Sequence, residues 1–222
     1  MKATPPQSTT ELLQRAQNLA GLTLAELAAR LNIPVPVNLL YAKGWVGQLL
    51  EGMLGASAGS KAEPDFPNLQ IELKTIPIND ENQPLESTYV CTTPLINISG
   101  LQWRQSVVYK KLAQVLWIPV EADASIPISQ RRVGNGLLWS PNAQQEQLLR
   151  TDWEELMELI ALGKVDSISA RHGVVLQIRP KAANAKALCW GIGEKGQKVL
   201  TLPRGFYLRA KFTVEILRQN YW

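Results

Sequence analysis

The sequence has only two cysteines and one histidine in 222 residues. Cys91 and Cys189 do not have the spacing of metal ligands, and we expect free thiols in a reducing cytoplasm rather than a disulfide. With His172 as the single histidine, we expect no Ser/His, Cys/His or histidine-metal mechanism. The scarcity of histidine and cysteine argues against the main rival hydrolase chemistries.

Long apolar runs are also missing. No stretch approaches the about 18 consecutive apolar residues that a membrane-spanning helix needs. The first ten residues contain Pro5-Pro6 and lack the apolar segment of a secretory signal. We therefore expect a cytoplasmic protein without a membrane partner. Its 222 residues suffice for one sizeable core, or for a core divided into two lobes by a cleft.

Acidic residues are scarce at the C-terminal end. The segment from Arg171 to Trp222 has ten Lys or Arg against two Glu, whereas the first 170 residues have 13 against 17 Asp or Glu. A concentrated positive segment suits a polyanionic partner. Carboxylates elsewhere suit a metal ion that is brought to a phosphate.

The segment Glu72-Leu73-Lys74 continues an alternation of apolar and charged residues. In a strand, Glu72 and Lys74 then share one face while Leu73 points into a core. Asp65 stands seven residues before Glu72 and directly follows a proline. A short turn or hairpin would bring its carboxylate alongside Glu72.

These residue types suit a divalent-metal site that cuts phosphodiester bonds. Mg²⁺ prefers oxygen ligands, so Asp65, Glu72 and the backbone carbonyl of Leu73 form a plausible inner shell. Lys74 could relay a proton of the attacking water or stabilise negative charge at phosphorus. Glu51 adds a third carboxylate that could place a second ion or orient the first. The alternative is a solvated strand face, which is the commoner context of Glu-x-Lys.

Periodicity predicts the elements around this motif. Helices are expected over 10–20, 24–31 and from about 43 to 55, and an apolar strand over 115–120 is expected to adjoin the metal strand. A strand over 88–93 is expected to pair with 71–76. A helix over 144–162 has an acidic face, predicted to be solvated, formed by Asp152, Glu154, Glu155 and Glu158.

Ordered segments along nearly the whole chain resemble the MutH family of DNA mismatch-repair endonucleases. The catalytic likeness rests on Glu51, Asp65 and Glu72-Leu73-Lys74 with their neighbours. The similar segments are 43–47, 49–51, 54–61, 65–66, 72–77, 84–86, 115–121, 130–134, 152–157, 179–187 and 201–208.

The resemblance implies a fold and a function. The fold is a single α/β domain over 1–222 of the restriction-endonuclease type, a mixed sheet flanked by helices with two arms around a DNA cleft. The N-terminal helical and catalytic arm would cover roughly 1–125 and the C-terminal DNA-reading arm roughly 126–222. The implied function is Mg²⁺-dependent nicking of the unmethylated strand at hemimethylated GATC sites, by a monomer that MutL activates downstream of MutS.

The resemblance also assigns residues that contact DNA. Lys43 and Lys111 match basic positions facing the backbone, and Arg179, Pro180 and Lys181 match the base-reading arm. Tyr207 matches the residue placed to sense adenine methylation. The chain departs from relatives at 40–42 and 107–109, where apolar residues replace charged ones. One alternative is a GATC restriction enzyme that cuts both strands. The other, suggested by these departures, is a catalytically silent DNA-binding module.

Overall fold

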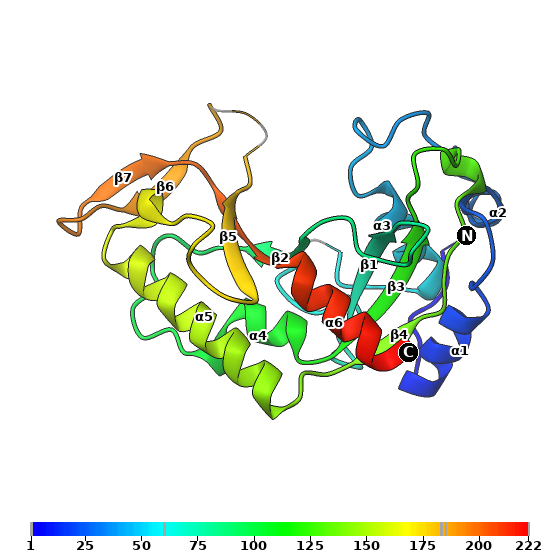
Figure 1. Ribbon diagram of the computed structural model, residues 1–222, viewed down its shortest axis with the longest axis horizontal. Coiled ribbons are helices and arrows are strands. Elements are labelled where there is room, and N and C mark those ends of the chain that lie inside the picture. Colours follow the sequence, from blue (N-terminus) through cyan, green and yellow to red (C-terminus); the bar gives the residue numbers. More distant parts are fainter. Residues whose placement is uncertain (1, 60, 183, 185, 222) are drawn as a thin grey trace. The chain divides into compact units, whose positions relative to one another are not determined.

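The computed structural model describes residues 2–59, 61–182, 184 and 186–221. Helices and short sheets alternate along the chain, so the predicted mixed α/β class is confirmed (Figure 1). The residues form two compact units, each assembled from separate stretches of sequence. Unit 1 comprises Met1–Glu86, Ala113–Ser140 and Asn220–Trp222, and unit 2 comprises Ser87–Leu112 and Pro141–Gln219.

Unit 1 is a three-stranded sheet covered by helices. Its elements are α1 (Thr9–Gln17), α2 (Leu24–Leu31), α3 (Trp45–Leu54), β1 (Glu72–Ile78), β3 (Val115–Glu121), the 3₁₀ helix η2 (Ile128–Gln130) and β4 (Leu137–Trp139). The strand order is β1-β3-β4, with β1 parallel and β4 antiparallel to β3. The prediction that the apolar strand adjoins the metal strand is confirmed by the pairing of Leu73 with Leu116.

Local chemistry sets the limits of the unit 1 helices. Ser8 caps α1, and Thr23 caps α2 in a reciprocal arrangement with Glu26 that satisfies backbone N–H groups at the helix start. Gly55 ends α3 with φ 84°, and a Cβ there would lie 2.2 Å from the Thr4 carbonyl oxygen. Only glycine fits that left-handed position without moving the backbone.

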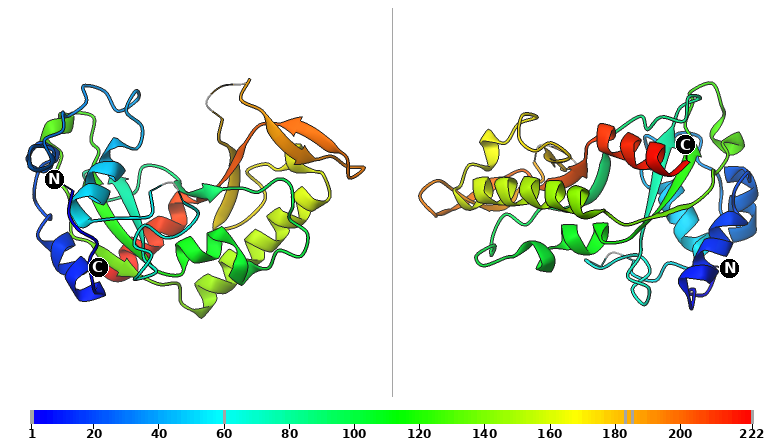
Figure 2. Two further views of the ribbon diagram at one scale, coloured as in Figure 1. Left: turned by 180° about the vertical axis from the view of Figure 1, so that it is seen from behind. Right: turned by 60° about the horizontal axis from the view of Figure 1, so that its bottom comes forward.

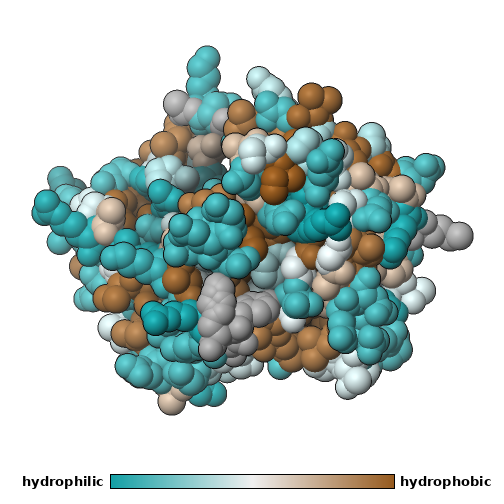
Figure 3. Space-filling model, turned by 45° about the vertical axis from the view of Figure 1, so that its right-hand side comes forward, coloured by the Kyte–Doolittle hydropathy of each residue, from teal (hydrophilic) through white to brown (hydrophobic). Residues whose placement is uncertain are grey.

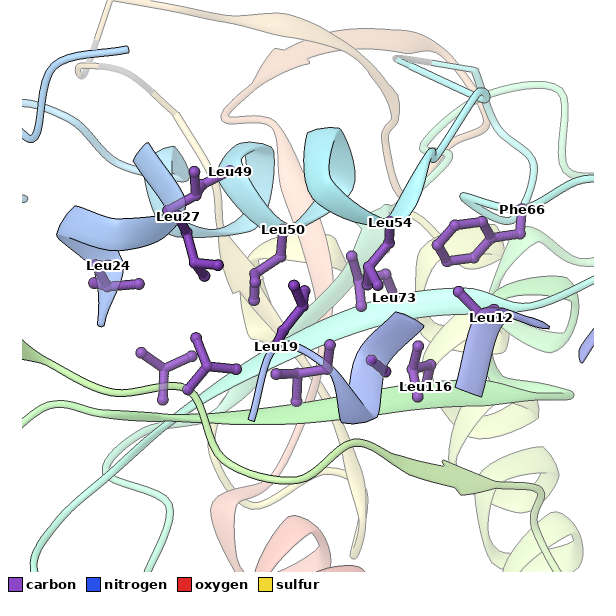
Figure 4. Packing of buried hydrophobic residues seen from close by; sticks show 14 of the residues in the cluster. Leu12, Leu19, Leu24, Leu27, Leu49, Leu50, Leu54, Phe66, Leu73 and Leu116 are labelled. Atoms are coloured by element: carbon purple, nitrogen blue, oxygen red, sulfur yellow. The ribbon is translucent and has the colours of Figure 1, made fainter. Parts of the chain in front are cut away.

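The core of unit 1 is largely aliphatic. Leucines from the three helices meet Leu73 and Leu116 of the sheet, with Phe66 at one end (Figure 4). The helix leucines are Leu12, Leu24, Leu27, Leu49, Leu50 and Leu54, and Leu19 after α1 joins them. Because all of these side chains are buried, the hydrophobic effect holds α3 against β1 and fixes the backbone that carries Glu72 and Lys74.

Unit 2 contains a second three-stranded sheet and a projecting hairpin. Its elements are β2 (Thr88–Thr92), η1 (Trp103–Gln105), α4 (Val107–Leu112), α5 (Ala143–Ala161), η3 (Val165–Ser167), β5 (Leu176–Pro180), β6 (Cys189–Ile192), β7 (Lys198–Thr201), β8 (Arg204–Leu208) and most of α6 (Ala210–Tyr221). The sheet order is β2-β8-β5, all antiparallel, and β6 pairs with β7. The β6–β7 hairpin lies beside the C-terminal end of α5 (Figure 2).

Two sequence expectations were wrong. The strand 88–92 pairs with β8 and not with the metal strand, because its cross-strand partners come from residues 205–208. The expected solvated acidic face of α5 includes Asp152, which is 3% exposed and accepts backbone N–H groups of residues 174–176. Helical periodicity had placed it among exposed glutamates.

The surface carries mixed polar and apolar residues. Figure 3 shows hydrophilic residues widely spread over the face in view, with smaller hydrophobic patches between them. None of the helices within the described ranges combines the length and apolar character needed to cross a membrane.

Candidate active site and nucleic-acid interface

A tight hairpin delivers Asp65 to the start of β1. The N–H of Phe66 donates to the carbonyl of Ile71 at 2.9 Å, and the N–H of Ile71 donates back at 3.3 Å. Both side chains are buried in the unit 1 core, which holds the hairpin closed. As a result, Oδ2 of Asp65 accepts the N–H of Leu73 at 2.9 Å.

Glu72 and Lys74 form an ion pair on one face of β1. Lys74 Nζ lies 2.5 Å from Glu72 Oε1, and the side chains are 14% and 1% exposed. Leu73 between them points into the hydrophobic core, as the alternation predicted. Burying two charges costs solvation that their attraction only partly offsets, so such a pair is weak evidence of stabilisation. The Asp65 carboxylate binds the backbone of Leu73, the residue between them, which is instead consistent with a chemical role.

The Asp65 carboxylate lies at the free side of β1. Glu72 donates its N–H to the carbonyl of Gln114, on the side of β3. Successive N–H groups of a strand point to opposite sides, so the N–H of Leu73 points away from β3. Asp65 accepts that N–H and therefore lies where no named strand pairs with β1. Asp65 therefore meets the backbone of β1 at its edge, while Glu72 and Lys74 pair on one face of the same strand.

Two further predicted residues of unit 1 lie on or beside α3. Glu51 is half-buried on this helix and lines a pocket with Lys2, Leu31, Ile33, Trp45, Gln48 and Gly59. Lys43 is exposed just before α3 and lines a second pocket that includes Arg131. The helix α3 packs on β1 through the face that carries Leu73, whereas Glu72 and Lys74 lie on the opposite face of the strand.

The donor set suits a hard cation by type. Within the described residues, no group of three or more His, Cys, Asp or Glu side chains is arranged to hold a metal ion. Mg²⁺ is commonly held by one or two carboxylates, with waters and substrate phosphates completing its shell. Asp65 and Glu72, with the Leu73 carbonyl, supply ligands of that kind. The residues therefore fit Mg²⁺ by their chemistry.

In unit 2, one face of the β5–β8 pair carries cations above tyrosine rings. Arg179 is opposite Gly205 in the ladder, and Tyr207 is opposite Gln177, so Arg179 and Tyr207 lie on the same face. The Arg179 guanidinium carbon is 5.9 Å from the centre of the Tyr207 ring. Arg179, Pro180 and Lys181 are all exposed. We call this surface, formed by Tyr89, Arg179, Lys181 and Tyr207, the reading face.

Tyr89 is the member of the reading face that the sequence did not reveal. It pairs with Tyr207 across β2 and β8, with ring centres 5.3 Å apart in an edge-to-face arrangement. Lys181 Nζ lies 3.5 Å from the centre of the Tyr89 ring. A Cβ on Gly205 would lie 2.9 Å from Tyr89 and 3.2 Å from Tyr207. The only sequence signal was an aromatic residue in a strand whose partner was wrongly predicted to be 71–76.

Lys111 lies on α4, which packs against β2 and therefore against the strand that carries Tyr89. It is half-buried, and its neighbour Lys110 is exposed. Unit 2 thus contains Lys111 and the reading face, while unit 1 contains Lys43, Glu51 and the Asp65–Glu72–Lys74 group.

Comparison with known proteins decides the family. The family model for the DNA mismatch repair enzyme MutH matches residues 54–152. The DNA mismatch repair protein MutH of Pectobacterium atrosepticum is 59% identical over 216 residues, which cover 97% of this chain and 94% of that protein. The chain belongs to the MutH family. The MutH proteins of Photorhabdus laumondii and Serratia proteamaculans are each 58% identical, and each alignment covers 98% of this chain.

Membership in the MutH family confirms the resemblance seen in the sequence. MutH proteins are DNA mismatch-repair endonucleases, which hydrolyse phosphodiester bonds, and this MutH-family chain is an enzyme of that class. Nucleases of this kind bind DNA and generally need a divalent metal ion. The roles of individual residues are taken up as proposals below.

Proposed function

We propose that this MutH-family enzyme nicks the unmethylated strand of hemimethylated GATC sites in double-stranded DNA and needs Mg²⁺ to do so. The observation that carries the proposal is that Asp65 binds the backbone N–H of Leu73, the residue between Glu72 and Lys74, which pair with each other on one face of β1. Acidic ligands and an ammonium group at one backbone position suit phosphodiester hydrolysis.

Asp65, Glu72 and the Leu73 carbonyl are the proposed ligands of Mg²⁺. When bound, the ion supplies a Lewis acid that lowers the pKa of water and offsets negative charge at phosphorus. Lys74 orients the attacking water, and its ammonium group relays a proton or stabilises charge at the phosphate. Glu51 orients Lys74 or the ligand set from α3.

The reading face is the proposed site of base recognition. Arg179 can donate two hydrogen bonds to guanine O6 and N7 in the major groove, and Lys181 adds a second cation. Pro180 fixes the backbone between them, and Tyr207 senses the methyl group of adenine. Lys43 and Lys111 contact phosphates. The architecture that this function implies is restriction-endonuclease-like, a single domain with two arms around a DNA cleft.

The partners implied by this function are unmethylated or hemimethylated GATC DNA, MutL as activator and MutS upstream of MutL. We propose that the enzyme acts as a cytoplasmic monomer, because one active site that meets one strand produces a nick.

A hemimethylated plasmid with one GATC site tests the proposal. We expect Mg²⁺-dependent conversion of supercoiled to nicked circular DNA, and loss of that product in Lys74→Ala and Glu72→Ala. Sequencing of the nicked strand should place the break in the unmethylated strand. The control is a plasmid in which the four bases of the GATC site are permuted, and it should remain supercoiled.

Other products would identify the alternatives. Linear DNA, with equal cleavage of methylated and unmethylated sites, would indicate a GATC restriction endonuclease. Binding without any product at saturating Mg²⁺, with and without MutL, would indicate a silent DNA-binding module. Either result would contradict the proposed nicking activity.

A further inference from the structure

Asp152 has an unusual environment for a carboxylate on a long amphipathic helix. It is 3% exposed, and its oxygens accept N–H groups from three consecutive residues of another segment. Val174 donates to both oxygens at 2.9 Å, Val175 donates to Oδ2 at 2.6 Å, and Leu176 donates to Oδ2 at 2.8 Å. Hydrogen bonds to a charged acceptor are about twice as strong as neutral ones, so Asp152 ties the start of β5 firmly to α5.

The backbone before β5 is shaped to make these bonds. Gly173 has φ 75°, and a Cβ there would lie 2.0 Å from the carbonyl oxygen of Leu176 and 3.4 Å from Asp152 Cγ. Successive N–H groups next to a left-handed residue form a concave anion site. Here the anion is the side chain of Asp152 itself.

Arg209 holds the same segment through its carbonyl groups. Its guanidinium Nη2 donates to the carbonyls of Ala170 at 2.8 Å and His172 at 2.9 Å. Its own backbone N–H donates to the carbonyl of Val175 at 2.8 Å. Arg209 directly follows β8, so a single residue connects the end of β8 with the residues that lead into β5.

We propose that Asp152 and Arg209 act together as a register clamp for the reading face. The carboxylate fixes the N–H groups of 174–176 and the guanidinium fixes the carbonyls of 170 and 172. Together they set the pairing of Leu176 with Leu208 at the end of the ladder. Both are positioning residues, since they lie outside the reading face.

The register of this ladder decides what the reading face presents. Arg179 is three residues beyond Leu176 and lies opposite Gly205. Because Gly205 has no side chain, the tyrosine rings fit beside it. A slip of one residue would turn Arg179 to the opposite face, where Ile178 is now buried. A loosened start of β5 would therefore spread Arg179 over several positions and weaken recognition of its base.

The inference rests on the proposed reading of GATC, so its test first measures the wild type on two duplexes. One contains GATC and the other contains the same four bases permuted. A wild type without preference for GATC would contradict the proposed function. With that preference established, Asp152→Asn and Arg209→Lys test the clamp, because each keeps the size of the side chain while removing charge or the forked donor geometry.

We expect each variant to raise KM for the GATC duplex at least about tenfold, the loss expected when one base contact is misplaced. The nicking rate at saturating DNA should stay at the wild-type value, because the catalytic groups belong to unit 1. Affinity for the permuted duplex should not change. Amide hydrogen exchange at 174–176 should become faster in Asp152→Asn.

Two controls separate positioning from general destabilisation. Glu154→Gln alters an exposed carboxylate on the same helix that pairs with Arg150, and should behave as wild type. Leu149→Ala removes buried side-chain volume from α5 and should lower the melting temperature without raising KM for GATC. Arg209→Lys provides the test if Asp152→Asn does not fold.

The decisive comparison uses Arg179→Ala as a background. If the clamp acts through Arg179, adding Asp152→Asn or Arg209→Lys to this variant should change KM little further. The proposal is overturned if the clamp variants keep the wild-type KM and preference for GATC. It is equally overturned if their effect on KM is undiminished in the Arg179→Ala background.

Discussion

The proposed catalytic group of unit 1, Asp65, Glu72 and Lys74, and the reading face of unit 2 hold their cations in opposite ways. Lys74 is almost buried and is joined to the 1% exposed Glu72 at 2.5 Å. Arg179 and Lys181 are exposed and lie over the rings of Tyr207 and Tyr89. One lysine is paired with an anion and little exposed, whereas the other two cations are exposed beside aromatic rings.

This difference suits the two proposed tasks, catalysis in unit 1 and DNA recognition in unit 2. Chemistry at phosphorus needs charges that are already in place, because reorganising them during the reaction would raise the barrier. Recognition of DNA needs cations that remain accessible, and cation–π contacts at exposed sites are weak enough, about 0.5–1 kcal/mol, to be exchanged for base or phosphate contacts. Changes in unit 1 should therefore reduce the rate, and changes in unit 2 should reduce affinity and selectivity.

Asp65→Asn should show the largest effect. The amide oxygen can still accept the N–H of Leu73, so the hairpin should stay closed while a negative charge is lost. We expect the single-turnover nicking rate to fall at least about 100-fold, as expected when roughly 3 kcal/mol of charge stabilisation is removed. Affinity for the GATC duplex should stay near wild type. An equal loss of rate and affinity would break the division between the two regions.

Gly205→Ala should have the next largest effect, and it should lower affinity for DNA instead of the nicking rate. The new Cβ would press on the rings of Tyr89 and Tyr207 and displace the cations above them. We expect affinity for GATC DNA to fall about 30-fold, equivalent to roughly 2 kcal/mol, with the rate at saturating DNA preserved.

Ile178→Val is the control for Gly205→Ala. It shortens a buried side chain on the opposite face of β5 and should lower stability by about 0.5–1.5 kcal/mol without changing affinity. Wild-type affinity in Gly205→Ala would mean that the tyrosine rings do not position the cations.

Tyr207→Ser should sharpen the comparison within unit 2. Removal of the ring should leave cleavage of unmethylated DNA intact and weaken that of hemimethylated DNA by up to about tenfold, the lower end of what one methylene is worth in a binding site. Tyr207→Phe keeps the ring and should retain the wild-type ratio. Competition between the two duplexes in one reaction measures this ratio directly, and an unchanged ratio in Tyr207→Ser would refute the sensor role.

Glu26 provides an exposed counterpart to Glu72 and the smallest expected effect. The backbone N–H of Thr23, followed by its hydroxyl, lowers the pKa of Glu26 in the folded state. Its contribution to stability is therefore present above the ordinary pKa and lost as pH falls through the lowered value. Between about pH 6 and pH 3, the melting temperature of wild type should fall slightly more than that of Glu26→Gln. Parallel curves would contradict this assignment.

Local patterns were sufficient where the structure depends on neighbouring residues. The helix 24–31 was predicted with the bounds that α2 has, because Thr23 is a good N-cap residue directly before its apolar pattern. The alternation around Leu73 placed Glu72 and Lys74 on one face, and the pairing of β1 with β3 followed from an apolar strand that needed a buried neighbour.

Long-range pairing was not readable from the same patterns. β2 pairs with β8, more than 110 residues along the chain, and alternation alone does not identify a partner at that distance. The burial of Asp152 depends on N–H groups of residues 174–176, so its helical position among glutamates was misleading. The two interleaved units arise from the same long-range contacts.

The hairpin between Phe66 and Ile71 has a consequence for how the catalytic group assembles. Its ends are only five positions apart and both side chains enter the core, so closing this loop restricts few backbone angles. Asp65 should therefore meet Leu73 as soon as the unit 1 core condenses, before any substrate arrives. The contact between Asp65 and β1 would then already be in place when the enzyme encounters DNA.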